Sequence, residues 1–200
     1  MEKVLITGGA GYLGSVLCEE LLDRGYHVTA LDNLTYKQVS LLHLCSHENF
    51  SFIKMDVTDF DGLAELMQEY DVIIPLAAIV GAPACDANPP LARAVNFEQI
   101  KTIVDNLRPL QKLIMPNTNS QYGSSEDIIT EESPFNPLSL YANTKCDAEN
   151  YIMRSENGIC LRLATVFGSS PRMRTDLLVN DFVYKSIVDG YLVVFQSHYK

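Results

Sequence analysis

The sequence contains no long apolar run. No stretch approaches the roughly 18 consecutive apolar residues that a membrane-spanning helix needs. The apolar run at the start, within MEKVLITGGAGYLG, is too short for a signal peptide and is followed at once by glycines. We therefore expect a soluble, cytoplasmic protein with no membrane partner.

Basic residues are also scarce. The chain has 15 Lys and Arg residues against 25 Asp and Glu residues, which gives a formal net charge of −10 at pH 7. A protein that binds nucleic acid without regard to sequence needs a basic face, so the charge balance argues against this class. Small anionic ligands are still possible, because backbone N–H groups and a few local Arg or Lys residues can hold phosphate.

The cysteines do not form a recognisable framework. There are 5 of them, an odd number, and none are spaced as C-x-x-C. A disulfide scaffold or a cysteine metal site is therefore not expected, and reduced thiols in the cytosol are the simplest interpretation. The 4 histidines are scattered without ligand spacing, so we expect no metal.

Short apolar runs alternate with amphipathic stretches along the whole chain. The apolar runs predict strands over 3–7, 27–32, 50–56, 71–78, 112–118 and 159–164. The stretches between them predict helices over 12–24, 35–46, 59–69, 90–107, 140–156 and 175–190. This alternation indicates an α/β fold, a Rossmann-like doubly wound parallel sheet with helices on both faces. A last apolar run, 190–200, reads as one more strand, and the loops 79–90, 119–138 and 168–174 follow strands, where ligands bind in such folds.

Glycines gather between the first predicted strand and the first predicted helix. Gly9, Gly11 and Gly14 fit the G-x-G-x-x-G fingerprint, and Gly8, Gly11 and Gly14 fit a three-residue spacing. Glycines there permit a tight turn, let the backbone approach a pyrophosphate, and let helix and strand pack closely. A glycine-rich turn without a ligand is the alternative, but the strand before and the helix after favour dinucleotide binding.

The second predicted strand ends in an acidic residue, Asp32, 18 residues after Gly14. A carboxylate at this distance can accept hydrogen bonds from an adenosine ribose. It would repel a 2′-phosphate, and no Arg stands beside it, so the pattern favours NAD over NADP. The alternative is an ordinary Asp-Asn turn.

Six motifs, in order, resemble those of the extended short-chain dehydrogenase/reductases, the NAD-dependent nucleotide-sugar epimerase and dehydratase group. They are TGGAGYLG, MDVTD, PLAA, VNFEQIKTIVD, SLYANTK and LRLATVFG, and they extend over nearly all 200 residues. Pro75 in PLAA replaces the usual His. The resemblance implies NAD-binding roles for Gly8, Gly11, Tyr12, Leu13, Gly14, Asp32, Asn33, Asp56, Val57, Leu76, Ala77, Ala78, Asn96, Tyr141 and Lys145.

The segment SLYANTK carries the implied acid/base. The resemblance makes Tyr141 the catalytic tyrosine and Lys145 its partner, which also binds the nicotinamide ribose. At i and i+4 the two side chains share a helix face. A free phenol has a pKa of about 10, and a nearby ammonium together with the positive nicotinamide ring should lower the pKa of Tyr141. By itself, the pair would also suit an ordinary helix surface.

The third catalytic residue follows the strand at 112–118. In TNSQYG, Thr118 matches the family's Ser or Thr, although Ser120 can share or take its role, and Gln121 stands where Val is usual. The 4,6-dehydratases carry Asp-Glu after this Thr. Asn119 and Ser120 occupy those positions here and cannot act as a general acid and base near neutral pH, which disfavours 4,6-dehydration.

The substrate side is less well defined. Arg172, Arg174 and Asn180 follow the strand where the family binds the nucleotide diphosphate, although the Arg residues are equally compatible with solvated loop charges. Thr165 stands where many members carry Asn, and Cys85 is expected to be a buried packing thiol. The predicted substrate-binding residues are Thr118, Ser120, Thr165, Arg172 and Asn180.

The resemblance implies a nucleotide-sugar epimerase that oxidises and reduces a sugar carbinol reversibly. The alternatives are a 4-keto sugar reductase or another sugar dehydrogenase or dehydratase, and, from another class, an inactive NAD-binding module or fragment. We divide the chain into an NAD-binding domain over 1–168 and the start of a substrate-binding region over 169–200, which we expect to be truncated. A homodimer through the helices at 90–107 and 140–156 is possible, with Ile100, Ile103 and Val104 facing either a partner or the sheet.

Overall fold

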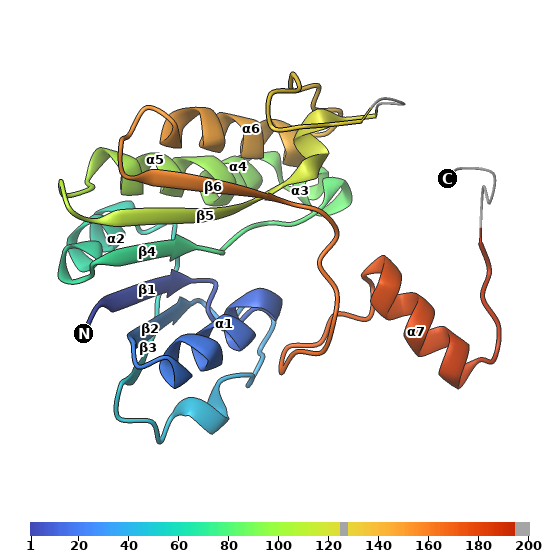
Figure 1. Cartoon of the computed structure of the whole chain (residues 1–200), viewed down its shortest axis with the longest axis horizontal. Helices are drawn as coiled ribbons and strands as arrows, with labels where there is room; N and C mark the ends of the chain where they lie inside the picture. The colour runs from blue at the N-terminus through green and yellow to red at the C-terminus, as the bar shows by residue number, and fades with distance from the viewer. Residues whose placement is uncertain (125–127, 195–200) are drawn as a thin grey trace.

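The structure is a computed structural model that describes residues 1–124 and 128–194. A parallel six-stranded sheet, in the order β3-β2-β1-β4-β5-β6, crosses the molecule (Figure 1). The strands are β1 (Lys3–Thr7), β2 (His27–Asp32), β3 (Phe50–Lys54), β4 (Val72–Pro75), β5 (Lys112–Thr118) and β6 (Gly158–Leu163). The doubly wound α/β fold predicted from the sequence is confirmed.

Helices cover both faces of the sheet. Figure 1 shows α1 (Tyr12–Asp23) on one side and α5 (Gln99–Asp105) and α6 (Leu140–Ile152) on the other. On β1, Val4 and Ile6 join the core under α1, whereas Leu5 joins the core that also contains α2 (Phe60–Leu66). Successive side chains of a strand point to opposite faces, so a strand buried on both faces needs apolar residues at every position.

The strand order reverses beside β1, which has β2 on one side and β4 on the other. In an open α/β sheet, such a reversal leaves a crevice at the carboxyl ends of the two diverging strands. The glycine loop follows β1 and the PLAA segment follows β4, so both lie at this crevice.

The helix predicted over 90–107 has three parts: α4 (Pro89–Arg93), a π-helical turn (Ala94–Glu98) and α5. Ile100 and Ile103 on α5 are buried in the core, which decides between the two faces that the sequence left open. The segment 79–90, predicted as a loop, also contains a short helix, α3 (Ala82–Ala87).

The helix predicted over 35–46 is wrong, because only a 3-10 turn at Leu42–Leu44 forms there. The Asp32 carboxylate accepts a hydrogen bond from the Leu34 backbone N–H at 2.8 Å, which holds the chain in a turn. Leu34 and Lys37 have φ angles of 57° and 52°, outside the right-handed helical region. Local side-chain bonding therefore overrides the helical periodicity.

The chain continues from β6 through an irregular segment to α7 (Leu178–Val188), which lies apart from the layers of the sheet (Figure 1). The strand predicted over 190–200 is not formed at 191–194, and its remainder lies outside the described residues. Within residues 1–124 and 128–194, no helix is long and apolar enough to cross a membrane.

Candidate active site

A cavity of about 950 Å³ opens at the carboxyl ends of the central strands. It brings together the glycine loop, the end of β2, the PLAA segment, the end of β5 and the start of α6. Of the residues predicted to bind cofactor or substrate or to act in catalysis, all but Asn96 and Asn180 line it: Gly8, Gly11, Tyr12, Leu13, Gly14, Asp32, Asn33, Asp56, Val57, Leu76, Ala77, Ala78, Thr118, Ser120, Tyr141, Lys145, Thr165 and Arg172.

The glycine loop has no room for side chains. A Cβ on Gly8 would lie 2.6 Å from the Ala77 backbone nitrogen, and Gly8 has a φ of 69°. A Cβ on Gly14 would lie 2.4 Å from the Gly8 carbonyl oxygen. The N-cap of α1 is Gly11, which supplies no side-chain acceptor for the first N–H groups of the helix. This end of α1 can therefore receive an anion such as a pyrophosphate.

Two carboxylates, those of Asp32 and Asp56, line the cavity near the glycine loop. Asp32 is 8% exposed, and it accepts hydrogen bonds from the backbone nitrogens of Ala10 at 3.1 Å and Leu34 at 2.8 Å. Asp32 therefore stabilises a turn, which was the alternative role considered for it, and it also lines the cavity. Partial burial of Asp56 acts to raise its pKa, but hydrogen bonds from Asn33 and Thr58 leave that pKa below its ordinary value.

The start of α6 positions Tyr141 and Lys145. The helix begins after Ser139, whose hydroxyl caps the Ala142 N–H at 3.1 Å. Lys145 is 6% exposed, and its Nζ lies 3.5 Å from the Pro116 carbonyl oxygen of β5. Burial lowers the pKa of the Lys145 amine to about 8, so the amine still carries its charge at neutral pH.

The Tyr141 phenol does not have the lowered pKa that the sequence predicted. Burial raises its pKa above the ordinary value of 10, while hydrogen bonding to Thr118 acts in the opposite direction. The nearby Cys85 adds to the increase, and the positive charge of Arg174 reduces it. In the protein without a bound nucleotide, removal from water therefore outweighs the hydrogen bonding with Thr118 and the charge of Arg174. The predicted lowering depends on the nicotinamide ring as well as on the Lys145 amine, and it stays a prediction for the NAD-bound protein.

Thr118 ends β5 beside this helix. Its hydroxyl donates to Ser120 Oγ at 3.1 Å and accepts from the Ser120 backbone nitrogen at 3.1 Å. The two hydroxyls that the sequence left as alternatives are therefore neighbours in one cavity. Gln121, the departure from the family pattern, is fully buried. Apart from a weak contact with the Cys146 thiol, its amide has no hydrogen-bond partner among the described residues.

Asn96 lies behind the cavity rather than in its wall. It is 1% exposed, and its amide exchanges hydrogen bonds with the backbone N–H and C=O of Ile79 at 2.8 and 3.0 Å. A third bond, at 3.3 Å, reaches the Thr144 hydroxyl of α6. Asn96 therefore joins the segment after β4 to the helix that carries Tyr141. Cys85 is buried beside it, as expected for a packing thiol.

Asn180 also turns away from the cavity. Its Oδ1 accepts from the Gly168 N–H at 2.9 Å, and its Nδ2 donates to the Arg174 carbonyl at 2.9 Å and to the Tyr12 hydroxyl at 3.0 Å. The Tyr12 hydroxyl in turn donates to the Gly168 carbonyl at 2.7 Å. These bonds fasten the segment 168–180 to the first turn of α1.

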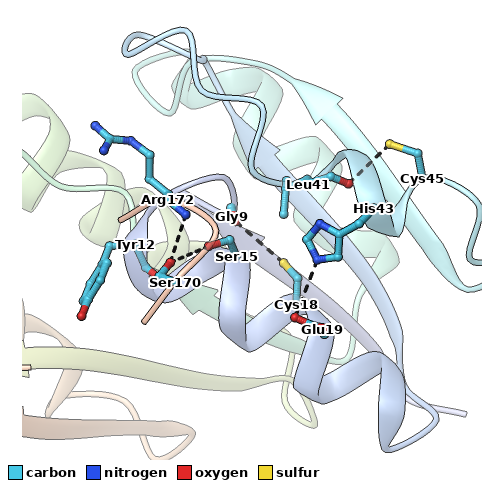
Figure 2. A network of polar contacts seen from close by, with 10 residues as sticks. All are labelled: Gly9, Tyr12, Ser15, Cys18, Glu19, Leu41, His43, Cys45, Ser170 and Arg172. Atoms are coloured by element: carbon cyan, nitrogen blue, oxygen red, sulfur yellow. Dashed lines mark hydrogen bonds and ion pairs between the residues drawn. The ribbon is translucent and has the colours of Figure 1, made fainter. Parts of the chain in front are cut away.

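Ser170, which the sequence did not single out, strengthens this attachment. Figure 2 shows its hydroxyl between the Ser15 side chain, at 3.1 Å, and the Tyr12 carbonyl, at 2.8 Å. The Arg172 backbone N–H donates to the same hydroxyl at 3.1 Å (Figure 2). A serine in a glycine- and proline-containing loop gives no periodic signal, so only the tertiary contact reveals its place.

The two arginines of this segment lie differently. The Arg172 guanidinium stacks on the Tyr36 ring, 5.4 Å from its centroid, which places it on the Asp32 side of the cavity. Arg174 lines the cavity too, but Asp176 holds its guanidinium in an ion pair of 2.5 Å. Among the described residues, no three His, Cys, Asp or Glu side chains come together as metal ligands.

Comparison with known proteins gives a consistent family. Residues 4–188 match the NAD dependent epimerase/dehydratase family. A Bacillus subtilis protein named uncharacterized UDP-glucose epimerase YtcB is 32% identical over 209 residues, covering 96% of this chain and 65% of that protein. UDP-glucuronic acid decarboxylase 1 of Danio rerio is 30% identical over 213 residues, covering 98% of this chain and 49% of that protein.

A solved structure agrees with these relatives. UDP-glucuronic acid 4-epimerase from Bacillus cereus, in complex with UDP-glucuronic acid and NAD, superposes with a TM-score of 0.83 at 30% identity. The match covers 98% of this chain and 66% of that chain. The chain thus spans about half to two-thirds of the length of the relatives it matches. It belongs to the NAD-dependent epimerase/dehydratase family.

Proposed function

We propose that the protein is an NAD-dependent nucleotide-sugar epimerase with Tyr141 as its acid/base. One observation carries the proposal: Thr118, Tyr141 and Lys145 line the same cavity as the glycine loop and Asp32. A module that only binds a dinucleotide has no need of a phenol, a hydroxyl and a buried amine at the far end of its cavity.

The cavity fits NAD. Gly8 and Gly14 leave no side chain in the loop, the first turn of α1 would offer N–H groups to the pyrophosphate, and Asp32 would bind the adenosine ribose. The Asp32 charge disfavours a 2′-phosphate, which supports NAD over NADP. The structure brings Arg172 to the same side of the cavity, so this preference rests on Asp32 alone and not on the absence of an arginine. When bound, NAD would supply a reversible hydride acceptor at the sugar carbinol.

The chain's own residues move and hold the proton. The Tyr141 oxygen takes the proton of the sugar hydroxyl and gives it back, while the Thr118 hydroxyl hydrogen-bonds the same sugar oxygen. The charged Lys145 amine would favour the phenolate form of Tyr141 and would contact the nicotinamide ribose. Because burial raises the pKa of Tyr141, loss of its proton requires a cation nearby, the role proposed for Lys145.

Nucleotide sugars are the proposed substrates because the relatives' names specify UDP-sugars. Ser120, Thr165 and Arg174 line the same cavity as Thr118 and are the proposed contacts. Arg172 is proposed to act on the nucleotide side, given its contact with Tyr36. Asn180 is proposed to hold the 168–180 segment rather than to touch substrate.

Decarboxylation is the second candidate, because one relative is a UDP-glucuronic acid decarboxylase. It would begin with the same oxidation and use the same three residues. A 4,6-dehydratase is disfavoured by Asn119 and Ser120, which line the cavity where an acid and a base would be needed. A reductase that uses NADPH is disfavoured by Asp32.

Three further proposals accompany this function. Residues 1–168 would bind NAD and carry the catalytic groups, and 169–200 would begin the substrate-binding region. The free thiols of Cys18 and Cys85 favour a reducing, cytoplasmic location. A homodimer would use the outer faces of the helices at 90–107 and 140–156, and light scattering of the purified protein tests it.

The experiment has two steps. First, the purified protein is denatured and the released small molecules are identified by mass spectrometry, with NAD expected in near-stoichiometric amount. Second, the protein with added NAD is incubated with UDP-glucose and with UDP-glucuronic acid, and the products are followed by NMR. An inverted C4 supports epimerisation, and loss of CO₂ supports decarboxylation. Release of NADP, or no conversion of either sugar despite bound NAD, would overturn the proposal.

A further inference from the structure

A buried carboxylate lies directly behind the proposed catalytic residues. Glu149 is on α6, one helical turn after Lys145 and two turns after Tyr141, and it is 3% exposed. Its Oε1 accepts a hydrogen bond from Arg162 Nε at 2.7 Å and lies 2.6 Å from Arg162 Nη2 in an ion pair. Its Oε2 accepts from Asn117 Nδ2 at 2.6 Å. Both carboxylate oxygens are therefore partnered inside the protein.

The two partners of Glu149 come from adjacent strands. Asn117 on β5 and Arg162 on β6 are opposite each other in the parallel ladder. Their side chains reach the same helix, so a single carboxylate connects α6 to both strands. Asn117 Nδ2 also lies 3.3 Å from the Lys145 carbonyl oxygen, and the next residue of β5 is Thr118.

Arg162 extends this connection to the segment after Thr118. Its Nη1 donates to the Tyr122 hydroxyl at 2.6 Å and to the Glu131 carbonyl at 2.7 Å. Its guanidinium also lies over the Phe135 ring, 4.8 Å from the centroid. All three guanidinium nitrogens thus have partners within the protein. Neither Glu149 nor Arg162 lines the cavity, so neither is placed to contact a substrate, whereas Asn117 is part of the cavity wall.

We propose that Asn117, Glu149 and Arg162 form a positioning unit that holds α6 in register with β5 and so sets where the Tyr141 phenol and the Lys145 amine lie relative to the Thr118 hydroxyl. The proposal rests on the proposed function for its consequence in turnover, but not for its geometry. The unit ties the backbone at Lys145 to the residue that precedes Thr118. These are the two places where a relative shift of helix and strand would separate the reacting groups.

A displacement of this kind has a large effect on rate. Catalytic groups act well only near their productive geometry, and an error of about 1 Å costs about 100-fold. Buried ion pairs are not needed for stability as such, because well-packed apolar residues often replace them without loss. A bonded carboxylate is, however, directional: it fixes the register of the helix on the sheet, which apolar packing specifies less sharply.

The test is a polarity exchange between two members of the unit. In Glu149→Gln the amide oxygen can still accept from Arg162. The amide nitrogen then faces Asn117 Nδ2, so two donors meet and the hydrogen bond to β5 is lost. Asn117→Asp places two carboxylates against each other. The double variant Asn117→Asp/Glu149→Gln restores a donor facing an acceptor between positions 117 and 149 and keeps the total charge. It does not restore the bond from position 117 to the Lys145 carbonyl. Asp147→Asn is the matched control, because Asp147 is on the same helix but forms an exposed ion pair with Arg93 at 3.4 Å.

Two readouts are taken on the full chain with NAD present. For epimerisation we expect kcat to fall about 10- to 100-fold in each single variant. In Glu149→Gln, whose side chain lies outside the cavity, KM and the NAD dissociation constant should change less than about threefold. The double variant should recover part of kcat, because it restores the link between positions 117 and 149 but not the bond to the Lys145 carbonyl, and the control should match the wild type. The proposal would be contradicted if kcat in the single variants fell only in proportion to the fraction of protein that is folded. It would also be contradicted if kcat did not recover in the double variant.

The second readout does not depend on turnover. Crystal structures of the wild type and of Glu149→Gln give the distance from Tyr141 Oη to Thr118 Oγ1. We expect it to change by more than about 0.5 Å in the variant, and an unchanged distance would rule out a positioning role even if the wild type proved inactive. If Glu149→Gln does not fold, Asn117→Ala takes its place, because it leaves the ion pair intact and removes only the bonds to α6.

Discussion

Lys145 places an amine where water is largely excluded. Burial lowers the pKa of this amine from 10.5 to about 8. Below pH 8 the amine is charged in both states, and the folded state carries the full cost of burying that charge, about 3 kcal/mol. Between pH 8 and 10.5 the unfolded state binds the proton more tightly, so this cost declines as the pH rises.

Replacing Lys145 with Met should therefore stabilise the nucleotide-free protein at pH 7. The advantage over the wild type should shrink as the pH rises from 8 toward 10.5. Urea unfolding of both proteins at several pH values measures this difference. Buried thiols such as Cys18, whose pKa is raised to about 12 by burial, affect both proteins alike. A difference that stays constant with pH would show that the amine is not the source.

Tyr141 is the residue on which the proposed chemistry depends most. Tyr141→Phe removes the phenolic oxygen but keeps the ring that fills the site. We expect kcat to fall by about 10²- to 10⁴-fold, the usual contribution of a general acid/base, with NAD binding nearly unchanged. Tyr151→Phe is the control, since Tyr151 is on the same helix but bonds Asp105 at the surface, at 2.5 Å. Full turnover in Tyr141→Phe would refute the assignment.

At the scale of elements, the contact between the β1–α1 turn and the segment after β4 controls the crevice. Gly8 and Gly25 both have positive φ angles, of 69° and 85°. A Cβ at position 8 would lie 2.6 Å from the Ala77 nitrogen, whereas a Cβ at position 25 would meet nothing within 4 Å. The two positions therefore share backbone strain and differ in the close approach.

Gly8→Ala should lower the free energy of unfolding by about 2 kcal/mol more than Gly25→Ala, because the added methyl forces two backbone segments apart. It should also weaken NAD binding, which Gly25→Ala should leave intact. Urea unfolding and calorimetric titration measure the two effects. Equal losses at both positions would mean that positive φ, rather than the close approach, requires glycine in the loop.

The elements also show where sequence patterns mislead. The periodicity over 35–46 suits a helix, but the side chain of Asp32 and the positive φ of Leu34 hold a turn instead. Over 90–107 the pattern correctly predicts a helical stretch but not its π-helical middle. That turn contains Asn96, which is hydrogen-bonded to the Ile79 backbone, 17 residues earlier in the chain. Such bonds leave no mark in a local pattern.

At the scale of the whole molecule, the segment 168–180 closes over the first turn of α1. Tyr12→Phe would remove the hydroxyl that joins Gly168 and Asn180 while keeping the ring. Losing these hydrogen bonds should speed NAD dissociation about tenfold, which corresponds to about 1.4 kcal/mol. Stopped-flow displacement of bound NAD measures the rate. Tyr26→Phe, just beyond the other end of α1, should leave the rate unchanged, and an unchanged rate in Tyr12→Phe would show that the segment does not retain the cofactor.

The sequence by itself determined the alternation of strands and helices, the glycine loop, and the acidic residue Asp32 at the end of the second strand. These features are local: apolar runs of a given length form buried strands, and a loop that must approach other backbone closely needs glycine. The family resemblance added the roles of Thr118, Tyr141 and Lys145, which stay predictions until they are tested.

The tertiary structure alone decided how these residues are held and charged. Glu149 finds Asn117 and Arg162, 32 and 13 residues away, and Ser170 finds the Tyr12 carbonyl 158 residues away. Burial raises the pKa of Tyr141 in the protein without a bound nucleotide. The long-range hydrogen bonds depend on which groups the fold brings together, and the pKa of Tyr141 depends on how much water the fold removes from around the phenol. A short stretch of sequence encodes neither the contacts nor the burial.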